Sequence, residues 1–224
     1  MAVLLPLHVA AGVIALLSVP VALGAGKRQG LHVVSDTTFA VGMLVIAVTG
    51  MGMVLLGADV FLAGISLFSG YLAASGWRDI RRRGPWAAPD RLLAALIGVA
   101  AALMAGIGVA RLDDDRTIGV TLLVFAGIAL GLFAFDVVRL LRPAPKLRGR
   151  TVDHLIKMQS ATIAALTAFL VVNVDNVVNV DNEGLIVWPS PTVVITPVIS
   201  WWTYRVAFGG WRPPSRSLIA LIGA

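Results

Sequence analysis

The chain has 224 residues, of which 58% are hydrophobic and only 13% are charged, and its formal net charge is +6. Water-soluble domains are about 45–50% apolar and about 25% charged, so this composition excludes a soluble globular protein and indicates an integral membrane protein. The chain contains no cysteine, which excludes disulfides, thiolate metal sites and cysteine nucleophiles. A basic balance in a membrane protein is typical of cytoplasmic loops, so we expect the lipid bilayer and no nucleic acid as a partner.

Hydropathy predicts seven transmembrane helices, each near the length of about 20 residues that crosses a bilayer core. In chain order they cover residues 3–23, 36–56, 60–75, 92–110, 117–141, 152–172 and 191–208. The last stretch contains Pro197, which removes a backbone donor, so six helices plus a re-entrant segment is the alternative. The predicted fold is an all-α polytopic transmembrane bundle, with one domain over residues 1–208 and a short cytoplasmic tail over 209–224.

Positive charges set the predicted orientation. Of the 18 Lys and Arg residues, 16 fall on the face that holds the C-terminal tail, and only Arg111 and Arg116 fall on the other. Because positive residues in short loops mark the cytoplasmic side, we expect the N-terminus outside and the C-terminus in the cytoplasm.

Small residues form two candidate packing faces. Gly98, Ala102 and Gly106 repeat every four residues in the fourth stretch, and Gly127 and Gly131 form a GxxxG pair in the fifth. Small residues at this spacing let helix backbones approach closely in a membrane. We expect them to pack helices within the bundle, and an interface between subunits is the alternative.

Asp136 and Lys157 are the two charges that fall inside predicted spans. A lone charge in a bilayer is costly, so each is expected to find a partner or to reach the interface. An ion pair between Asp136 and Lys157 is one prediction, and a pair between Asp136 and Arg139 is another. A proton or ion relay through these groups is the functional hypothesis.

His32 and His154 begin helices that start from the same face, whereas His8 lies near the opposite face. Imidazole and carboxylate groups bind divalent transition metals, so His32, His154, Asp36 and Asp153 form a candidate metal site. His32 and His154 are also candidate haem ligands or proton carriers. Hydrogen bonds to backbone or lipid headgroups are the alternative role of such interfacial histidines.

Several short motifs carry a resemblance. They are HVAAG at 8–12, PVAL at 20–23, the segment 26–32 that ends at His32, HLIKM at 154–158, LTAFLVVN at 166–173 and the pair Trp201-Trp202. In these motifs the chain resembles a large bacterial family of predicted membrane proteins with a domain of unknown function (number 2306). The resemblance implies a helical protein of the bacterial inner membrane, and it implies no reaction.

Sequence motifs of hydrolases, kinases and proteases are lacking, which favours a non-enzymatic function. The leading hypothesis is an accessory subunit that packs against a larger respiratory or photosynthetic membrane complex. The alternative is a protein whose cytoplasmic-face His and Asp residues bind a metal or haem or relay protons. A small transporter is the third hypothesis.

Overall fold

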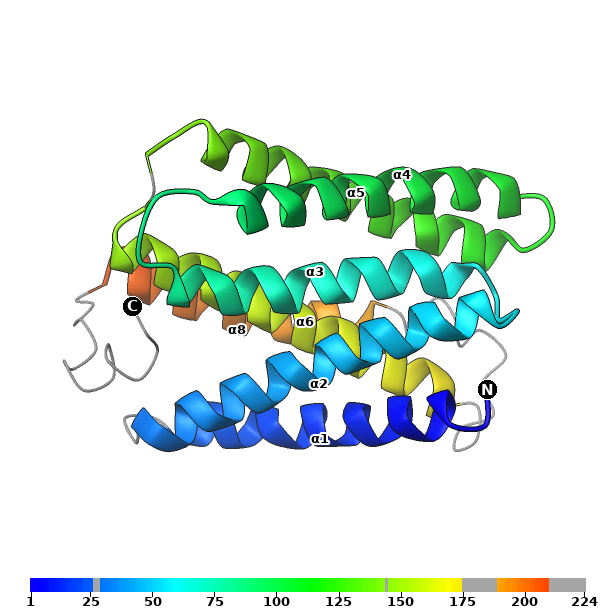
Figure 1. The fold of residues 1–224 in the computed structure, drawn as a ribbon, viewed down its shortest axis with the longest axis horizontal. Helices are drawn as coiled ribbons and strands as arrows, with labels where there is room; N and C mark the ends of the chain where they lie inside the picture. Colours follow the sequence, from blue (N-terminus) through cyan, green and yellow to red (C-terminus); the bar gives the residue numbers. More distant parts are fainter. Residues whose placement is uncertain (26–28, 144, 175–188, 210–224) are drawn as a thin grey trace.

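The computed structural model describes residues 1–25, 29–143, 145–174 and 189–209. These residues form seven helices and no strand (Figure 1), which confirms the predicted all-α fold. In chain order the helices are α1 (Leu4–Gly24), α2 (Gln29–Leu55), α3 (Phe61–Arg81), α4 (Ala88–Arg111), α5 (Arg116–Leu140), α6 (Leu147–Val174) and α8 (Ser190–Ala207).

Five of the described helices are long and apolar enough to cross a membrane, namely α1, α2, α4, α5 and α6. The helix α3 carries charges near its C-terminal end, and α8 runs through Pro197 without a break in the assigned helix. The apolar bundle is therefore compatible with an integral membrane protein. Seven crossings, and the orientation of the chain, stay predictions, and most of the predicted tail lies outside the described residues.

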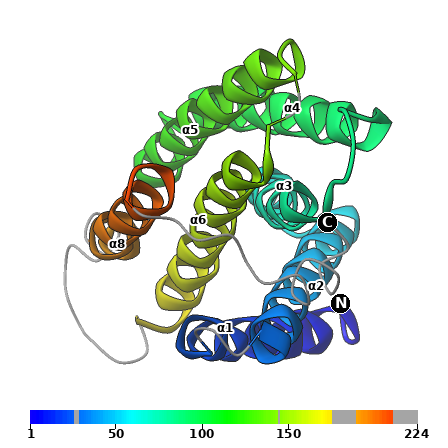
Figure 2. The same cartoon turned by 90° about the vertical axis from the view of Figure 1, so that its left-hand side faces the viewer.

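The helix α3 lies at the centre of the bundle (Figure 2). It contacts α2, α4 and α6, while α1 packs on α2, α5 packs on α4, and α8 packs on α6. The largest fully buried side chains come from the inward faces of α2 to α5: Met43, Tyr71, Leu72, Ile97, Met104 and Leu122. The core is thus shared by several helices rather than formed by one pair.

Large apolar side chains also cover the outside of the bundle. Val41 at the middle of α2 is 50% exposed, and Val99 at the middle of α4 is 53% exposed. Water would disfavour so much exposed hydrocarbon, whereas lipid tails are as apolar as these side chains. The outer surface is therefore one that a bilayer would solvate.

Three helices extend farther on the predicted cytoplasmic side than hydropathy indicated. The helix α2 begins at Gln29, α3 continues to Arg81, and α6 begins at Leu147. Polar side chains in these added turns lowered the hydropathy of the sequence. The turns are nevertheless helical, and polar side chains in them, such as Asp79, form ion pairs with other residues. The longer helices place Asp36 two turns into α2, Asp153 in the second turn of α6 and Asp79 in the last turn of α3, and the candidate sites form there.

Most of the glycines at the predicted spacing do not pack within the described bundle. A Cβ atom added at Gly106, Gly127 or Gly131 would meet nothing within 4 Å, which corrects the prediction that these residues pack within the bundle. Close contact between α4 and α5 occurs instead where a Cβ on Gly119 would lie 3.0 Å from the Gly108 carbonyl oxygen.

The two remaining positions of the predicted faces differ from each other. A Cβ on Gly98 would lie 3.1 Å from the Phe133 ring, so this glycine does contact α5, whereas Ala102 is exposed. The α4 face therefore turns away from its neighbour over most of its length, because the helices meet along a different stripe.

Candidate functional site

Lys157 of α6 is buried between α3 and α5, and it is only 5% exposed. Its Nζ atom lies 3.0 Å from Oδ2 of Asp79 and 3.2 Å from Oδ1 of Asp136. The Tyr71 hydroxyl donates to Oδ2 of Asp136 at 2.7 Å. We call Tyr71, Asp79, Asp136 and Lys157 the lysine cluster. It contains the predicted Asp136 and Lys157 contact, and Arg139 bonds to Asp153 instead of Asp136.

Further ion pairs surround the lysine cluster. Arg82 lies 3.6 Å from Asp79 and 3.5 Å from Asp90, and Arg78 donates to both oxygens of Asp90 at 2.7 and 3.0 Å. Together with the Arg139–Asp153 pair, four cations face four carboxylates. Charge balance matters here, because an uncompensated buried charge is strongly destabilising.

The lysine cluster borders a cavity of about 20 Å³, which Ser75, Asp79, Asp136 and Lys157 help to line. One water molecule needs at least about 10–15 Å³ and several polar partners. Ser75 is buried and adds a hydroxyl group to this lining. The cavity thus suits one water molecule and leaves no room for an organic ligand.

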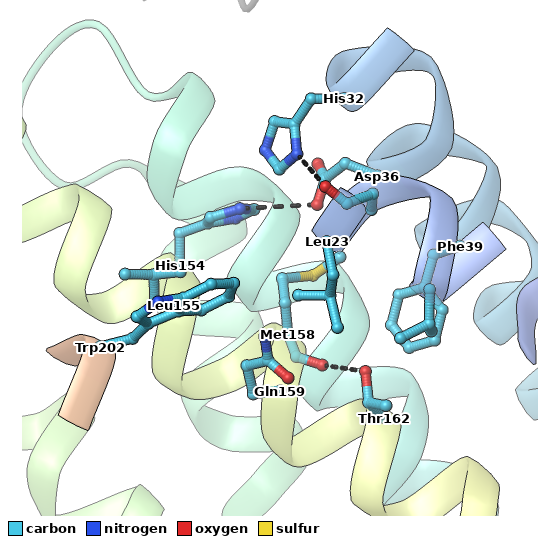
Figure 3. A pocket seen from close by; sticks show the side chains of 12 residues that line it. Leu23, His32, Asp36, Phe39, His154, Leu155, Met158, Gln159, Thr162 and Trp202 are labelled. Carbon is cyan, nitrogen blue, oxygen red and sulfur yellow. Dashed lines mark hydrogen bonds and ion pairs between the residues drawn. The ribbon is translucent and has the colours of Figure 1, made fainter. Parts of the chain in front are cut away.

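A larger pocket of about 260 Å³ lies between α1, α2, α6 and α8, and we call it the histidine pocket. Figure 3 shows His32, Asp36 and His154 in the upper part of the view and Leu23, Phe39 and Met158 below them. His32 and His154 therefore line one pocket, as their shared face allowed. The two histidines and Asp36 gather at one end, and the other end is lined by apolar side chains together with Gln159 and Thr162 (Figure 3).

A backbone carbonyl determines which nitrogen of His154 carries hydrogen. Nδ1 of His154 lies 2.9 Å from the Gly76 carbonyl oxygen, which can only accept, so Nδ1 must donate. Nε2 then lies 3.5 Å from Oδ1 of Asp36. A neutral imidazole and an ionised carboxylate would bring two lone pairs together at this contact. The two atoms thus face each other at the end of the pocket that holds His32, Asp36 and His154.

His32 is oriented in the same way. Its Nδ1 lies 3.0 Å from the Ala22 carbonyl oxygen, so Nδ1 donates there, and Nε2 has no partner among the described residues. The charge of the Arg81 guanidinium acts on Asp36, and the guanidinium donates to the Thr37 hydroxyl at 3.0 Å. The histidine pocket thus offers one free imidazole nitrogen beside the His154–Asp36 pair.

The predicted metal and haem sites do not fit these residues. Asp153 is absent from the pocket lining and pairs with Arg139. No group of three or more His, Cys, Asp or Glu side chains among the described residues is arranged to hold a metal ion. The pocket is also smaller than the about 300–1,000 Å³ of sites for drug-sized ligands, which excludes a haem macrocycle from this arrangement.

Other residues show what sequence reasoning missed. His8 does lie apart from the pocket, with Nδ1 2.9 Å from the Thr49 hydroxyl. Asp79 and Tyr71 were not singled out. Gly76 was missed as well, although a Cβ there would lie 3.0 Å from Cβ of Lys157. Gly76 therefore serves both sites, because it makes room for Lys157 and its carbonyl orients His154.

The chain matches no family model, no curated protein and no solved structure. The resemblance to the family with a domain of unknown function therefore stays a prediction, and the function must be argued from the two buried sites themselves.

Proposed function

We propose that this protein binds a small, mainly apolar ligand in the histidine pocket and exchanges a proton with it through the His154–Asp36 pair. The observation that carries the proposal is the fixed orientation of His154. Its Nδ1 is bonded to the Gly76 carbonyl, so Nε2 faces Oδ1 of Asp36 at 3.5 Å, where a proton on either atom would make the contact attractive. A group that holds a proton beside a cavity can give it to a ligand in that cavity.

The lining of the pocket defines the class of ligand. Leu23, Phe39 and Met158 form apolar walls, while the free Nε2 of His32 can bind one polar atom of a ligand. A ligand with a hydrogen-bonding head and a compact apolar body fits this division. The volume of about 260 Å³ limits that body to a small molecule or to one end of a longer one.

Nitrogen-15 NMR of labelled histidine tests the shared proton directly, because the chain has only three histidines. We expect His154 to carry hydrogen on Nδ1 throughout, and a proton on or near Nε2 at neutral pH. Replacement of Asp36 by Asn removes the carboxylate that stabilises this proton. The fraction of His154 with hydrogen on Nε2 should then fall.

His8 serves as the control, since its partner Thr49 lies outside the pocket. Its signals should be the same in the wild type and in Asp36→Asn. Unchanged Nε2 signals of His154 in the Asp36 variant would refute proton sharing and, with it, the proposed exchange.

An accessory role in a larger bacterial inner-membrane complex is the second proposal. It is supported by an outward groove of about 730 Å³ between α4 and α5, lined by small residues that include Gly98, Ala102 and Gly127. Small-residue faces suit close contact with another transmembrane helix. Replacing Ala102 by Leu should release a partner subunit during purification in mild detergent without lowering the stability of this chain.

A further inference from the structure

A third and larger groove, of about 940 Å³, lies between α5, α6 and α8. These are neighbouring helices in Figure 2. The groove extends from Arg116 and Pro189, where α5 and α8 begin, to Phe208 at the other end of α8. It is therefore nearly as long as the bundle, and it is separate from the histidine pocket.

Hydroxyl groups line this groove without partners. Thr117 and Thr121 of α5 and Thr192, Thr196 and Ser200 of α8 all face it, and none makes a side-chain hydrogen bond among the described residues. A hydroxyl in an apolar surrounding loses free energy unless it is hydrogen-bonded. An occupant with oxygen acceptors near one end would satisfy these donors.

Threonines elsewhere in the bundle behave differently. Thr37, Thr151 and Thr162 each donate to the carbonyl four residues earlier in their own helix, at 2.8, 2.9 and 3.0 Å. Such a bond satisfies a hydroxyl inside a membrane without any ligand. The groove hydroxyls lack this bond, which leaves them available to an occupant.

The described lining of the groove holds one charged side chain, Arg116, at the end where α5 begins and next to Asp113, Asp114 and Asp115 in the chain. Arg116 lines the groove and pairs with no carboxylate among the described residues. The other arginine of this end, Arg111, is neutralised by Asp59 at 3.0 Å. A phosphate group at Arg116 would be attracted by the charge and by the bidentate donors of guanidinium.

We propose that the groove binds an anionic phospholipid of the bilayer, with its phosphate at Arg116. Thr121 lies five residues farther along α5, which places it about 7.5 Å deeper. The headgroup and interfacial layer of one leaflet is about 5–7 Å thick, so Thr121 lies close to the depth at which it can donate to an ester carbonyl. The acyl chains then lie against Ile163 and Ile199.

The chemistry of the groove favours a lipid over a partner helix. The Arg116 guanidinium and the groove hydroxyls can bind the phosphate and ester oxygens of a lipid, whereas the surface of a transmembrane helix is mainly apolar. Acyl chains are thin and flexible, and they can fill a narrow space between three helices. The proposal is independent of the histidine pocket, since none of these residues lines that pocket.

Native mass spectrometry after incubation with an equal mixture of phosphatidylglycerol and phosphatidylcholine tests the proposal. The wild type should retain phosphatidylglycerol in preference to phosphatidylcholine. In Arg116→Gln this preference should fall about fivefold, the effect of one basic residue near a lipid surface. The matched control is Arg111→Gln, which should keep the preference of the wild type.

A second variant tests the groove without altering its charge. Ser160 lines the groove from α6, and Ser160→Trp would fill part of the space that the acyl chains need. We expect this variant to lose retention of both lipids, at an unfolding temperature that shows an intact fold. Retained preference for phosphatidylglycerol in Arg116→Gln, or undiminished lipid binding in folded Ser160→Trp, would overturn the proposal. A wild type without preference would overturn it too.

Discussion

The helix α3 is the more polar and the more buried of the pair α3 and α5. In a soluble protein the more buried helix would be the more apolar one. The helix α3 carries Tyr71 and Asp79, and most of its length is buried. The helix α5 is apolar enough to span a membrane, yet Val124 and Leu130 on it are exposed. Charged and hydroxyl groups of this pair therefore lie inside the bundle and apolar side chains lie on its outside, as expected when the solvent is lipid.

The largest effect should come from breaking the charge balance inside. Lys157→Met removes the cation that Asp79 and Asp136 share and leaves Asp79 with only Arg82 at 3.6 Å, so we expect a loss of about 3–5 kcal/mol of stability. Thermal unfolding in detergent would measure it. Adding Asp79→Asn to Lys157→Met should restore part of the loss, because one of the two carboxylates that lost the lysine is removed.

An exposed pair provides the comparison. Arg111→Met removes the partner of Asp59 at the surface, where such pairs contribute about 1 kcal/mol or less. An equal loss of unfolding free energy in Lys157→Met and Arg111→Met would contradict a buried, charge-balanced lysine cluster.

A smaller effect should separate glycines that touch a backbone from glycines that face outward. In Gly119→Leu the new Cβ would lie 3.0 Å from the Gly108 carbonyl oxygen, so the α4–α5 contact must open. Overpacking of this kind costs about 1–3 kcal/mol. Gly106→Leu, with open space around it, should be neutral or slightly stabilising because leucine favours helix. Equal unfolding temperatures for the two variants would contradict the described contact.

The smallest expected effect concerns a surface carboxylate in the loop before α3. The backbone N–H of Phe61 donates to Asp59 at 2.8 Å, and this bond, with Arg111 beside it, lowers the pKa of Asp59. A carboxyl group with a lowered pKa stabilises the fold at neutral pH, and this contribution is lost as pH falls through the lowered pKa. Asp59→Asn should therefore reduce stability at neutral pH and have no effect in strong acid.

The all-helical fold could be predicted from sequence, because long apolar stretches leave few alternatives. The ends of α2, α3 and α6 could not, since polar side chains in the added turns, such as His32, Asp79 and Arg148, lowered the hydropathy there. Whether a charged turn stays helical depends on partners from other helices. The basic segment that begins at Arg78 did contain a signal, because Asp79 is an acidic residue among arginines.

The sites were predictable only in part. Counting the predicted membrane crossings put His32 and His154 on the same face. The count could not show that Asp36 faces His154 while Asp153 faces Arg139. Adjacent residues on a helix point in directions about 100° apart, so rotation of α6 decides which pocket each enters. The prediction of the packing glycines failed for the same reason. Their spacing defines one face of a helix, but it does not show which neighbouring helix contacts that face.

Spin labels in liposomes test the central claim, that apolar side chains face lipid while charges face inward. Single cysteines at Val41 and Val99, in this chain without cysteine, would carry the labels at exposed mid-helix positions. A label at Gly84, in the loop between α3 and α4, would report on water. We expect oxygen to relax the two helix labels strongly and a water-soluble nickel reagent to relax only the loop label. Strong relaxation of Val41 and Val99 labels by the nickel reagent would place those faces in water and contradict the account.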